Sequence, residues 1–163
     1  MKMRWMMGLL ALAMTVGACW GDEPAEPAKF YKLEFVVKEV AGTKVLNSRT
    51  YMTMVSTGST ADIRAGSKVP FVLGPSSVTQ IDVGVNISVK TVKEVQDRLT
   101  FFITAEISSL AEGSTEKAQP TIRQNRWGAA MIVPLKKPTL LFSSENVDAK
   151  SQMEIEVTAT PLP

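Results

Sequence analysis

Three stretches of the chain carry an apolar residue at every second position, with mostly polar residues between. Apolar residues occupy every second position from Ile81 to Val89, from Leu99 to Ile107 and, near the end, from Met153 to Ala159. A period of two places every apolar side chain on one face of a strand. Residues 93–97 (KEVQD) form a short polar connection between the first two stretches. We therefore expect a long antiparallel hairpin with one buried face there.

The predicted core lies on the apolar phase of these strands. It includes Val83, Val85, Ile87, Phe101, Ile103, Ile155 and Val157. The last strand ends at Pro161, because proline cannot donate to a ladder.

The remaining segments also predict strands. Residues 30–40 and 44–56 flank Ala41-Gly42-Thr43, where Gly42 can supply the positive φ of a tight turn. Residues 61–64 and 68–72 read as short strands on either side of Gly66. Residues 121–135, with Trp127, Ala129, Met131 and Val133 on one side, and residues 139–142 complete the set, whereas 111–119 read as an exposed loop. No segment after residue 29 shows a helical period, so we expect an all-β fold, an antiparallel β-sandwich or a strongly curved sheet.

The first residues have a different character. Residues 1–18 combine a basic start, an apolar run and a small-residue ending, and Val16-Gly17-Ala18-Cys19 resembles the lipobox of bacterial lipoproteins. The resemblance implies that residues 1–18 are a signal peptide and that Cys19 carries the lipid. Residues 19–29 are acidic and Pro-rich, as in a flexible tether, and residues 30–163 are expected to form a single all-β domain. Trp20 after the cysteine favours the outer membrane, facing the periplasm.

Charge and composition exclude several classes of function. Removal of Lys2 and Arg4 leaves 16 basic residues against 16 acidic ones, so no basic excess remains for nucleic acid. The chain has no His and one Cys, which excludes Ser-His-Asp and Cys-His catalysis, His or Cys zinc sites and an internal disulfide. We therefore expect no catalytic or metal-binding residues and no cofactor.

Two sets of polar residues are weighed as candidate sites. Six carboxylates have no spacing that makes them converge, so solvated surface is favoured over catalysis or metal binding: Asp62, Asp82, Glu106, Asp148, Glu154 and Glu156. Arg123 and Arg126 near Trp127 suit either a cation–π patch or structural ion pairs, and ion pairs are favoured.

Four motifs follow one another in a fixed order between Ile63 and Phe142. They are residues 63–70 (IRAGSKVP), 81–89 (IDVGVNISV), 102–109 (FITAEISS) and 120–126 (PTIRQNR). This series resembles the C-terminal domain of the secretin family, the outer-membrane pores of type II and type III secretion and of type IV pili. Secretins share a G-x-x-x-P element, a D-V-G strand, a strand ending in E-I/V-S and a P-x-I/F-x-x-R strand. The resemblance implies a secretin-like β-fold.

The glycines in these motifs have a structural meaning of their own. Gly84 in mid-strand is typical of a bend, a bulge or a close approach, and Gly66 and Pro70 predict a turn and a sheet edge. Residues 74–80 leave little room for a gate hairpin, and residues 136–139 (KKPT) replace the Gly-rich closing turn of the family. We therefore interpret the resemblance as one of fold.

The leading hypothesis is a non-enzymatic, lipid-anchored cell-envelope β-domain that acts as a structural or interaction module. Its partners are the membrane, through the lipid anchor, and an envelope protein or a secretion-related complex. One alternative is a small-molecule or lipid carrier whose sheets enclose a cavity. Another is a subunit of a secretin-like outer-membrane pore.

Overall fold

The computed structural model describes residues 27–74, 77–111, 121–145 and 151–163, which form eight strands and no helix. The strands are β1 (Phe30–Ala41), β2 (Lys44–Ser56), β3 (Ala61–Gly74), β4 (Ser77–Val95), β5 (Arg98–Leu110), β6 (Ile122–Pro134), β7 (Thr139–Glu145) and β8 (Gln152–Pro161). The described part of the chain thus contains no helix that could cross a membrane. The predicted all-β fold is confirmed.

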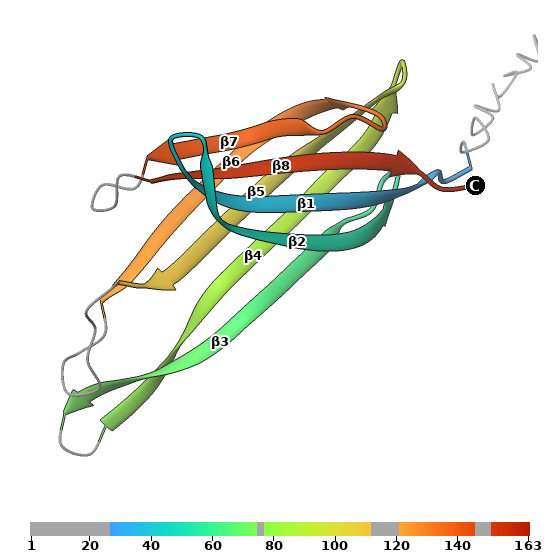
Figure 1. Cartoon of the computed structure of the whole chain (residues 1–163). Coiled ribbons are helices and arrows are strands. Elements are labelled where there is room, and N and C mark those ends of the chain that lie inside the picture. The colour runs from blue at the N-terminus through green and yellow to red at the C-terminus, as the bar shows by residue number, and fades with distance from the viewer. Residues whose placement is uncertain (1–26, 75–76, 112–120, 146–150) are drawn as a thin grey trace, which may run out of the picture.

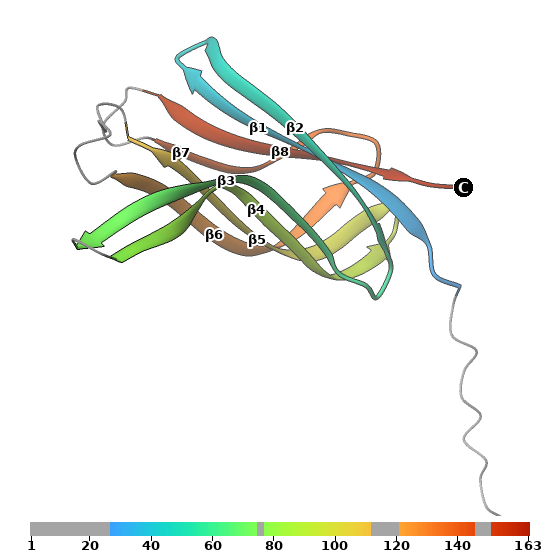
Figure 2. The ribbon, with the colours of Figure 1, turned by 90° about the horizontal axis from the view of Figure 1, so that it is seen from below.

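The strands form two antiparallel sheets that pack face to face (Figures 1 and 2). We call the sheet β2-β1-β8-β7 the terminal sheet, because it holds the first and last strands, and β3-β4-β5-β6 the central sheet. The core between them is apolar, and its largest fully buried side chains are Tyr31, Phe35, Leu33, Ile87, Leu99, Ile103, Ile155, Val89, Val92, Val133 and Val157. The molecule is therefore an antiparallel β-sandwich, one of the two architectures expected from the sequence.

The β4–β5 hairpin keeps the predicted phase but has a tighter turn. The predicted connection 93–97 is wrong, because β4 continues to Val95 and only Gln96 and Asp97 form the turn, with φ of 48° and 57°. Both central residues of a two-residue type I′ turn have positive φ, as here. A register shift between Lys90 and Lys93 changes the alternation and leaves Val92 fully buried.

The β1–β2 hairpin turns at Gly42 and Thr43, and Gly42 has the predicted positive φ, 59°. In contrast, Gly66 is not a turn. The two short strands expected around it are one continuous strand, β3, paired with β4 along its length. The prediction of an edge at Pro70 is confirmed, because β3 is the outer strand of the central sheet.

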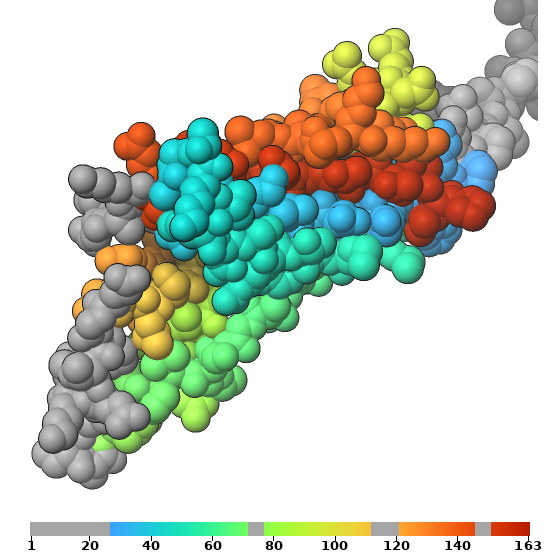
Figure 3. Space-filling view, in the orientation of Figure 1, coloured from blue at the N-terminus to red at the C-terminus, as the bar shows by residue number. Residues whose placement is uncertain are grey.

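Six of the seven predicted core residues are buried, with at most 6% of their surface exposed, and Val83 is the exception. Its side chain has the predicted phase but is only half-buried and lies outside the core cluster. The reason is visible in Figure 3, where the green β3–β4 hairpin extends beyond the terminal sheet. The alternation thus predicted correctly which face of the strand Val83 lies on, but it could not predict how far the opposite sheet extends.

The two ends of the sandwich differ. At one end, which we call the closed end, β1 begins and β8 finishes, and turns and chain segments are tied to neighbouring strands by backbone hydrogen bonds. Gly58 donates to Val92 at 2.9 Å, Lys136 to Ala159 at 2.7 Å, and Leu162 to Phe30 at 2.8 Å. At the other end, the splayed end, the β1–β2 and β3–β4 hairpins point apart (Figure 2).

Candidate functional site

A pair of glycines marks the point where the β3–β4 hairpin leaves the sandwich. Gly66 and Gly84 lie directly opposite each other, and Gly84 has a φ of +153°. A Cβ on Gly84 would lie 2.5 Å from the Gly66 Cα and against the Ala65 carbonyl, while one on Gly66 would meet the Val83 carbonyl. Only glycine at both positions allows this approach, so of the bend, bulge or close approach expected at Gly84 the structure shows the close approach.

The same point ends the pairing of β4 with β5. Their backbone ladder starts at Val85 and Ile107. At Gly84 the Ser108 side chain forms the hydrogen bonds in place of the β5 backbone. The Gly84 N–H donates to the Ser108 hydroxyl at 3.0 Å, and that hydroxyl donates to the Gly84 carbonyl at 3.4 Å. Ser67–Gly74 and Ser77–Val83 therefore form a two-stranded ribbon without β5, which we call the arm.

The arm has two unlike faces. Val69 pairs with Ile81 on the face that continues the core phase, and both side chains are half-buried outside the core cluster. On the opposite face the Lys68 ammonium lies 3.2 Å from the Asp82 carboxylate, with both side chains largely exposed. Such an exposed pair adds little stability. The arm is therefore held mainly by its own ladder.

Two grooves open at the splayed end. One, of about 440 Å³, runs over the glycine pair on the outer face of the central sheet and is bordered by Arg64, Asp82 and Glu106. The other, of about 270 Å³, lies in the mouth between the sheets and is bordered by Arg123 and Met153. Both mix positive and negative side chains. Neither is the deep apolar cavity that a lipid carrier needs.

The candidate carboxylates are spread over the surface. Asp82 and Glu106 border one groove, Asp62 is exposed elsewhere on β3, and Asp148 lies outside the described residues. On β8, Glu156 accepts a hydrogen bond from the Lys38 ammonium at 2.6 Å, and Glu154 lies on the same face. Among the described residues no three side chains gather as metal ligands.

Arg123, Arg126 and Trp127 do not form one patch. The Trp127 ring packs on Phe142, with ring centroids 5.3 Å apart, and both side chains contact the core. Arg126 lies on the opposite phase of β6, so it points away from the neighbouring Trp127, and it forms no ion pair with a described residue. Arg123 borders the groove between the sheets. The favoured ion pair is thus wrong for Arg126.

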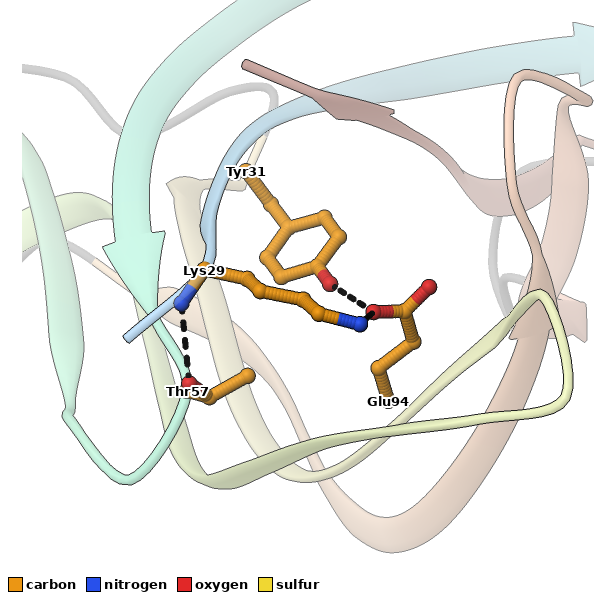
Figure 4. A network of polar contacts seen from close by, with 4 residues as sticks. All are labelled: Lys29, Tyr31, Thr57 and Glu94. Atoms are coloured by element: carbon orange, nitrogen blue, oxygen red, sulfur yellow. Dashed lines mark hydrogen bonds and ion pairs between the residues drawn. The ribbon is translucent and has the colours of Figure 1, made fainter. Parts of the chain in front are cut away.

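A polar network fastens the start of β1 at the closed end (Figure 4). The Tyr31 hydroxyl donates to the Glu94 carboxylate at 2.7 Å, and the Lys29 ammonium binds the same oxygen at 2.5 Å. The Lys29 backbone N–H donates to the Thr57 hydroxyl at 3.2 Å, and the Thr57 N–H donates back to the Lys29 carbonyl at 2.9 Å. We call these four residues the clamp, and sequence analysis did not find it.

The clamp changes the acidity of two of its members. Hydrogen bonds from Lys29 and then Tyr31 lower the pKa of Glu94 below its ordinary value. Burial, followed by the hydrogen bond to Glu94 and its charge, raises the pKa of Tyr31 above its ordinary value. At neutral pH the clamp therefore holds a charged carboxylate and a neutral phenol, the states that its hydrogen bonds require.

Residues 1–18, Cys19 and the tether as far as residue 26 lie outside the described residues, as does most of the predicted loop 111–119. Signal cleavage and lipidation at Cys19 remain predictions.

Comparison with known proteins gives a likeness of fold. No protein-family model and no curated protein matches the chain. Among solved structures, the InvG secretin domain of the Salmonella SPI-1 injectisome matches with a TM-score of 0.51 at 6% identity, covering 83% of this chain and 62% of that one. The type II secretion secretin XcpQ of Pseudomonas aeruginosa matches with a TM-score of 0.52 at 10% identity, covering 83% and 56%.

ExeD of Aeromonas hydrophila gives a TM-score of 0.50 at 11% identity, covering 83% of this chain and 46% of that one. The chain thus spans about three fifths or less of the length of these structures. At such low identity the likeness shows the fold alone. It shows that the fold of this chain is similar to that of secretin domains, as the four motifs predicted.

Proposed function

We propose that this chain is a non-enzymatic, lipid-anchored module of the bacterial cell envelope that serves a secretion-related complex. The observation that carries the proposal is the fold, which is similar to secretin domains of a type II and a type III system. The described surface adds support, because its carboxylates are dispersed and its grooves lack a converging acid, base and nucleophile.

The anchor is the lipid on Cys19, the new first residue after signal cleavage. It holds the domain at the outer membrane, facing the periplasm, by the short segment that ends at Lys29. The test is labelling of cells with a fatty-acid analogue, comparing wild type with Cys19→Ser. Label on the wild type alone supports the anchor. An unlabelled wild type, or a variant that still sediments with membranes, contradicts it.

The outer edge of β6 is the surface proposed to receive a partner strand. No described strand pairs with this edge. The other edges are protected: β3 contains Pro70, β7 has only seven residues, and β2 carries Lys44 and Arg49. The second half of β6, Trp127–Val133, has no charged residue. An added strand would gain main-chain hydrogen bonds there and choose its partner through alternate side chains.

Site-specific photo-cross-linking in native membranes tests this edge. A photoreactive residue at Ala130, exposed on β6, is compared with one at Thr158 on β8, which has a neighbouring strand on each side. We expect a discrete cross-linked envelope protein from position 130 and none from 158. Equal cross-linking from both positions, or none from 130, contradicts the edge as the partner surface.

An outer-membrane pore is the alternative function that must be distinguished from this proposal. A pore requires many copies to close their sheets into a barrel, because open sheet edges cannot face lipid. We expect the mature chain carrying Cys19→Ser to stay in solution without detergent as a monomer or small oligomer without channel activity. A large ring that conducts ions in planar bilayers would contradict the interaction module and favour the pore.

A further inference from the structure

Basic side chains gather at the closed end of the sandwich. Five of them are exposed there: Lys90, Lys93, Arg98, Lys136 and Lys137. The Leu135 N–H donates to the Asp97 carbonyl at 3.3 Å, which places the β4–β5 turn beside the β6–β7 turn. The five side chains thus share one end of the molecule although they come from the β4–β5 hairpin and from the β6–β7 turn. We call them the basic patch.

The patch carries uncompensated charge. Among the described residues, none of its five members forms an ion pair. Three acidic residues lie near this end: Asp97 in the β4–β5 turn, Asp62 opposite Ser88 at the start of β3, and Glu94, which is already bound by Lys29 and Tyr31 in the clamp. Among these three described residues, only Asp62 and Asp97 are left to offset the five positive charges of the patch. The closed end is therefore positive, although the mature sequence has equal numbers of basic and acidic residues.

The described chain also begins at this end. The clamp fixes Lys29 against Thr57 and Glu94, and the backbone of Leu162 binds Phe30 beside it. Nine residues lie between Cys19 and Lys29, so the segment spans ten residue steps. A fully extended chain covers about 3.3–3.6 Å per residue, so Cys19 lies at most about 36 Å from the clamp. A lipid on Cys19 would hold the closed end, and not the splayed end, next to the bilayer.

We propose that the basic patch docks the closed end on a membrane surface through anionic lipid headgroups. The proposal extends the lipid anchor of the proposed function by giving the domain a fixed orientation, with the arm and both grooves directed away from the membrane. Phe30 and Val95, which are 54% and 53% exposed at the same end, supply apolar contact with the headgroup region. Lysine and arginine are attracted to anionic lipid surfaces within about a Debye length.

A second occupant competes for the patch. Asp22, Glu23 and Glu26 precede the described residues and carry the opposite charge. Binding of this segment to the patch would leave little charge for lipid, so the experiment includes a variant in which all three residues are neutral (Asp22→Asn, Glu23→Gln and Glu26→Gln).

Vesicle binding of the mature chain with Cys19→Ser tests the patch without the lipid anchor. The vesicles contain phosphatidylglycerol with phosphatidylcholine, or phosphatidylcholine alone, and bound protein is measured by flotation. We expect binding to the anionic vesicles only, weakened by salt. Each neutralised charge should lower binding about fivefold, so Lys136→Gln with Lys137→Gln lowers it roughly 25-fold.

The matched control removes two positive charges at the splayed side of the molecule, Lys44→Gln with Arg49→Gln, and should leave vesicle binding unchanged. Equal losses from both pairs would overturn the patch in favour of net charge. Absence of binding by the wild type overturns it too, and binding that then appears in the neutral-segment variant identifies the acidic segment as the occupant. Fatty-acid labelling tests the anchor separately, so either proposal can fail without the other.

Discussion

The closed end and the splayed end are built from the same strands but are packed differently. On β1, Tyr31, Leu33 and Phe35 near the closed end are at most 1% exposed, whereas Val37, further along the same face, is only half-buried. On β2 the contrast is larger, since Val55 is buried and residues 44–50 are all exposed. Pointing toward the opposite sheet is therefore not enough to bury a side chain. The side chain is buried only where the opposite sheet extends far enough to cover it.

The two ends also differ in what holds them. The closed end combines the core with backbone bonds between turns and with the clamp. The splayed end has strand ladders, the glycine pair and an exposed ion pair on the arm, together with side-chain hydrogen bonds such as the one from the Ser151 hydroxyl to the Glu39 carboxylate at 2.7 Å. Regions with few buried apolar contacts open at low free energy. The difference predicts a stable half and a more easily opened half, which the following variants test.

The largest expected effect comes from matched phenylalanines in the two halves. Phe101 is 3% exposed in the core and Phe71 is half-exposed on the arm. Phe101→Ala should lower the free energy of unfolding by about 3–5 kcal/mol because it leaves a cavity. Phe71→Ala should cost less than about 1.5 kcal/mol. Urea unfolding followed by circular dichroism measures both, and equal losses would mean that the arm is packed as tightly as the core.

The glycine pair gives the next effect. Gly84→Ala should destabilise the protein by about 2–3 kcal/mol, because alanine is strained at its positive φ and its methyl group meets the opposite backbone. Gly128→Ala is the control, since its Cβ would lie 3.4 Å from the nearest atom, the Ile103 carbonyl oxygen.

The strained arm should also be cut faster by protease in Gly84→Ala than in Gly128→Ala. If the two variants unfold at the same urea concentration, the glycine pair does not hold the arm in place.

The contrast between the ends shows what the sequence could predict. Apolar residues at every second position identify the strands and their inner faces, and the motifs around Gly84 and Glu106 indicate the secretin-like fold. Alternation is local and does not report how far a second sheet extends, so Val83 was assigned to the core. It also fails where an irregular residue shifts the phase, as at Thr91, whose φ of 56° accompanies the burial of Val92.

Features formed by residues far apart in the sequence leave no pattern within any one segment of the chain. Gly66 alone resembles a turn residue, and only its register opposite Gly84 explains why the strand continues. Tyr31 and Glu94 are 63 residues apart, so no motif spacing connects them in the clamp. The basic patch likewise combines the β4–β5 hairpin with the β6–β7 turn, which become neighbours only in the folded sandwich. Lys136 and Lys137 are the available hint, but from the sequence alone they indicate only a departure from a family motif.

The clamp provides a smaller test of the closed end. Tyr31→Phe keeps the buried ring and removes the hydroxyl that donates to Glu94, so it should cost about 1 kcal/mol. Tyr51→Phe is the matched control, because Tyr51 is half-buried in the same sheet and its hydroxyl has no hydrogen-bond partner among the described residues. It should change the free energy of unfolding by less than about 0.5 kcal/mol. Equal effects of the two substitutions would show that the hydrogen bond from Tyr31 to Glu94 does not stabilise the closed end.

The smallest expected effect is the pH dependence of the clamp. Because the pKa of Glu94 is lowered in the folded state, its contribution to stability is complete above its unfolded value of about 4.3 and is lost as the pH falls through the folded value. The raised pKa of Tyr31 acts at the other extreme, where stability falls as the pH rises above about 10. The difference in unfolding free energy between wild type and Glu94→Gln should therefore shrink on acidification. A difference that stays constant down to about pH 2 would show that the Glu94 charge does not stabilise the closed end.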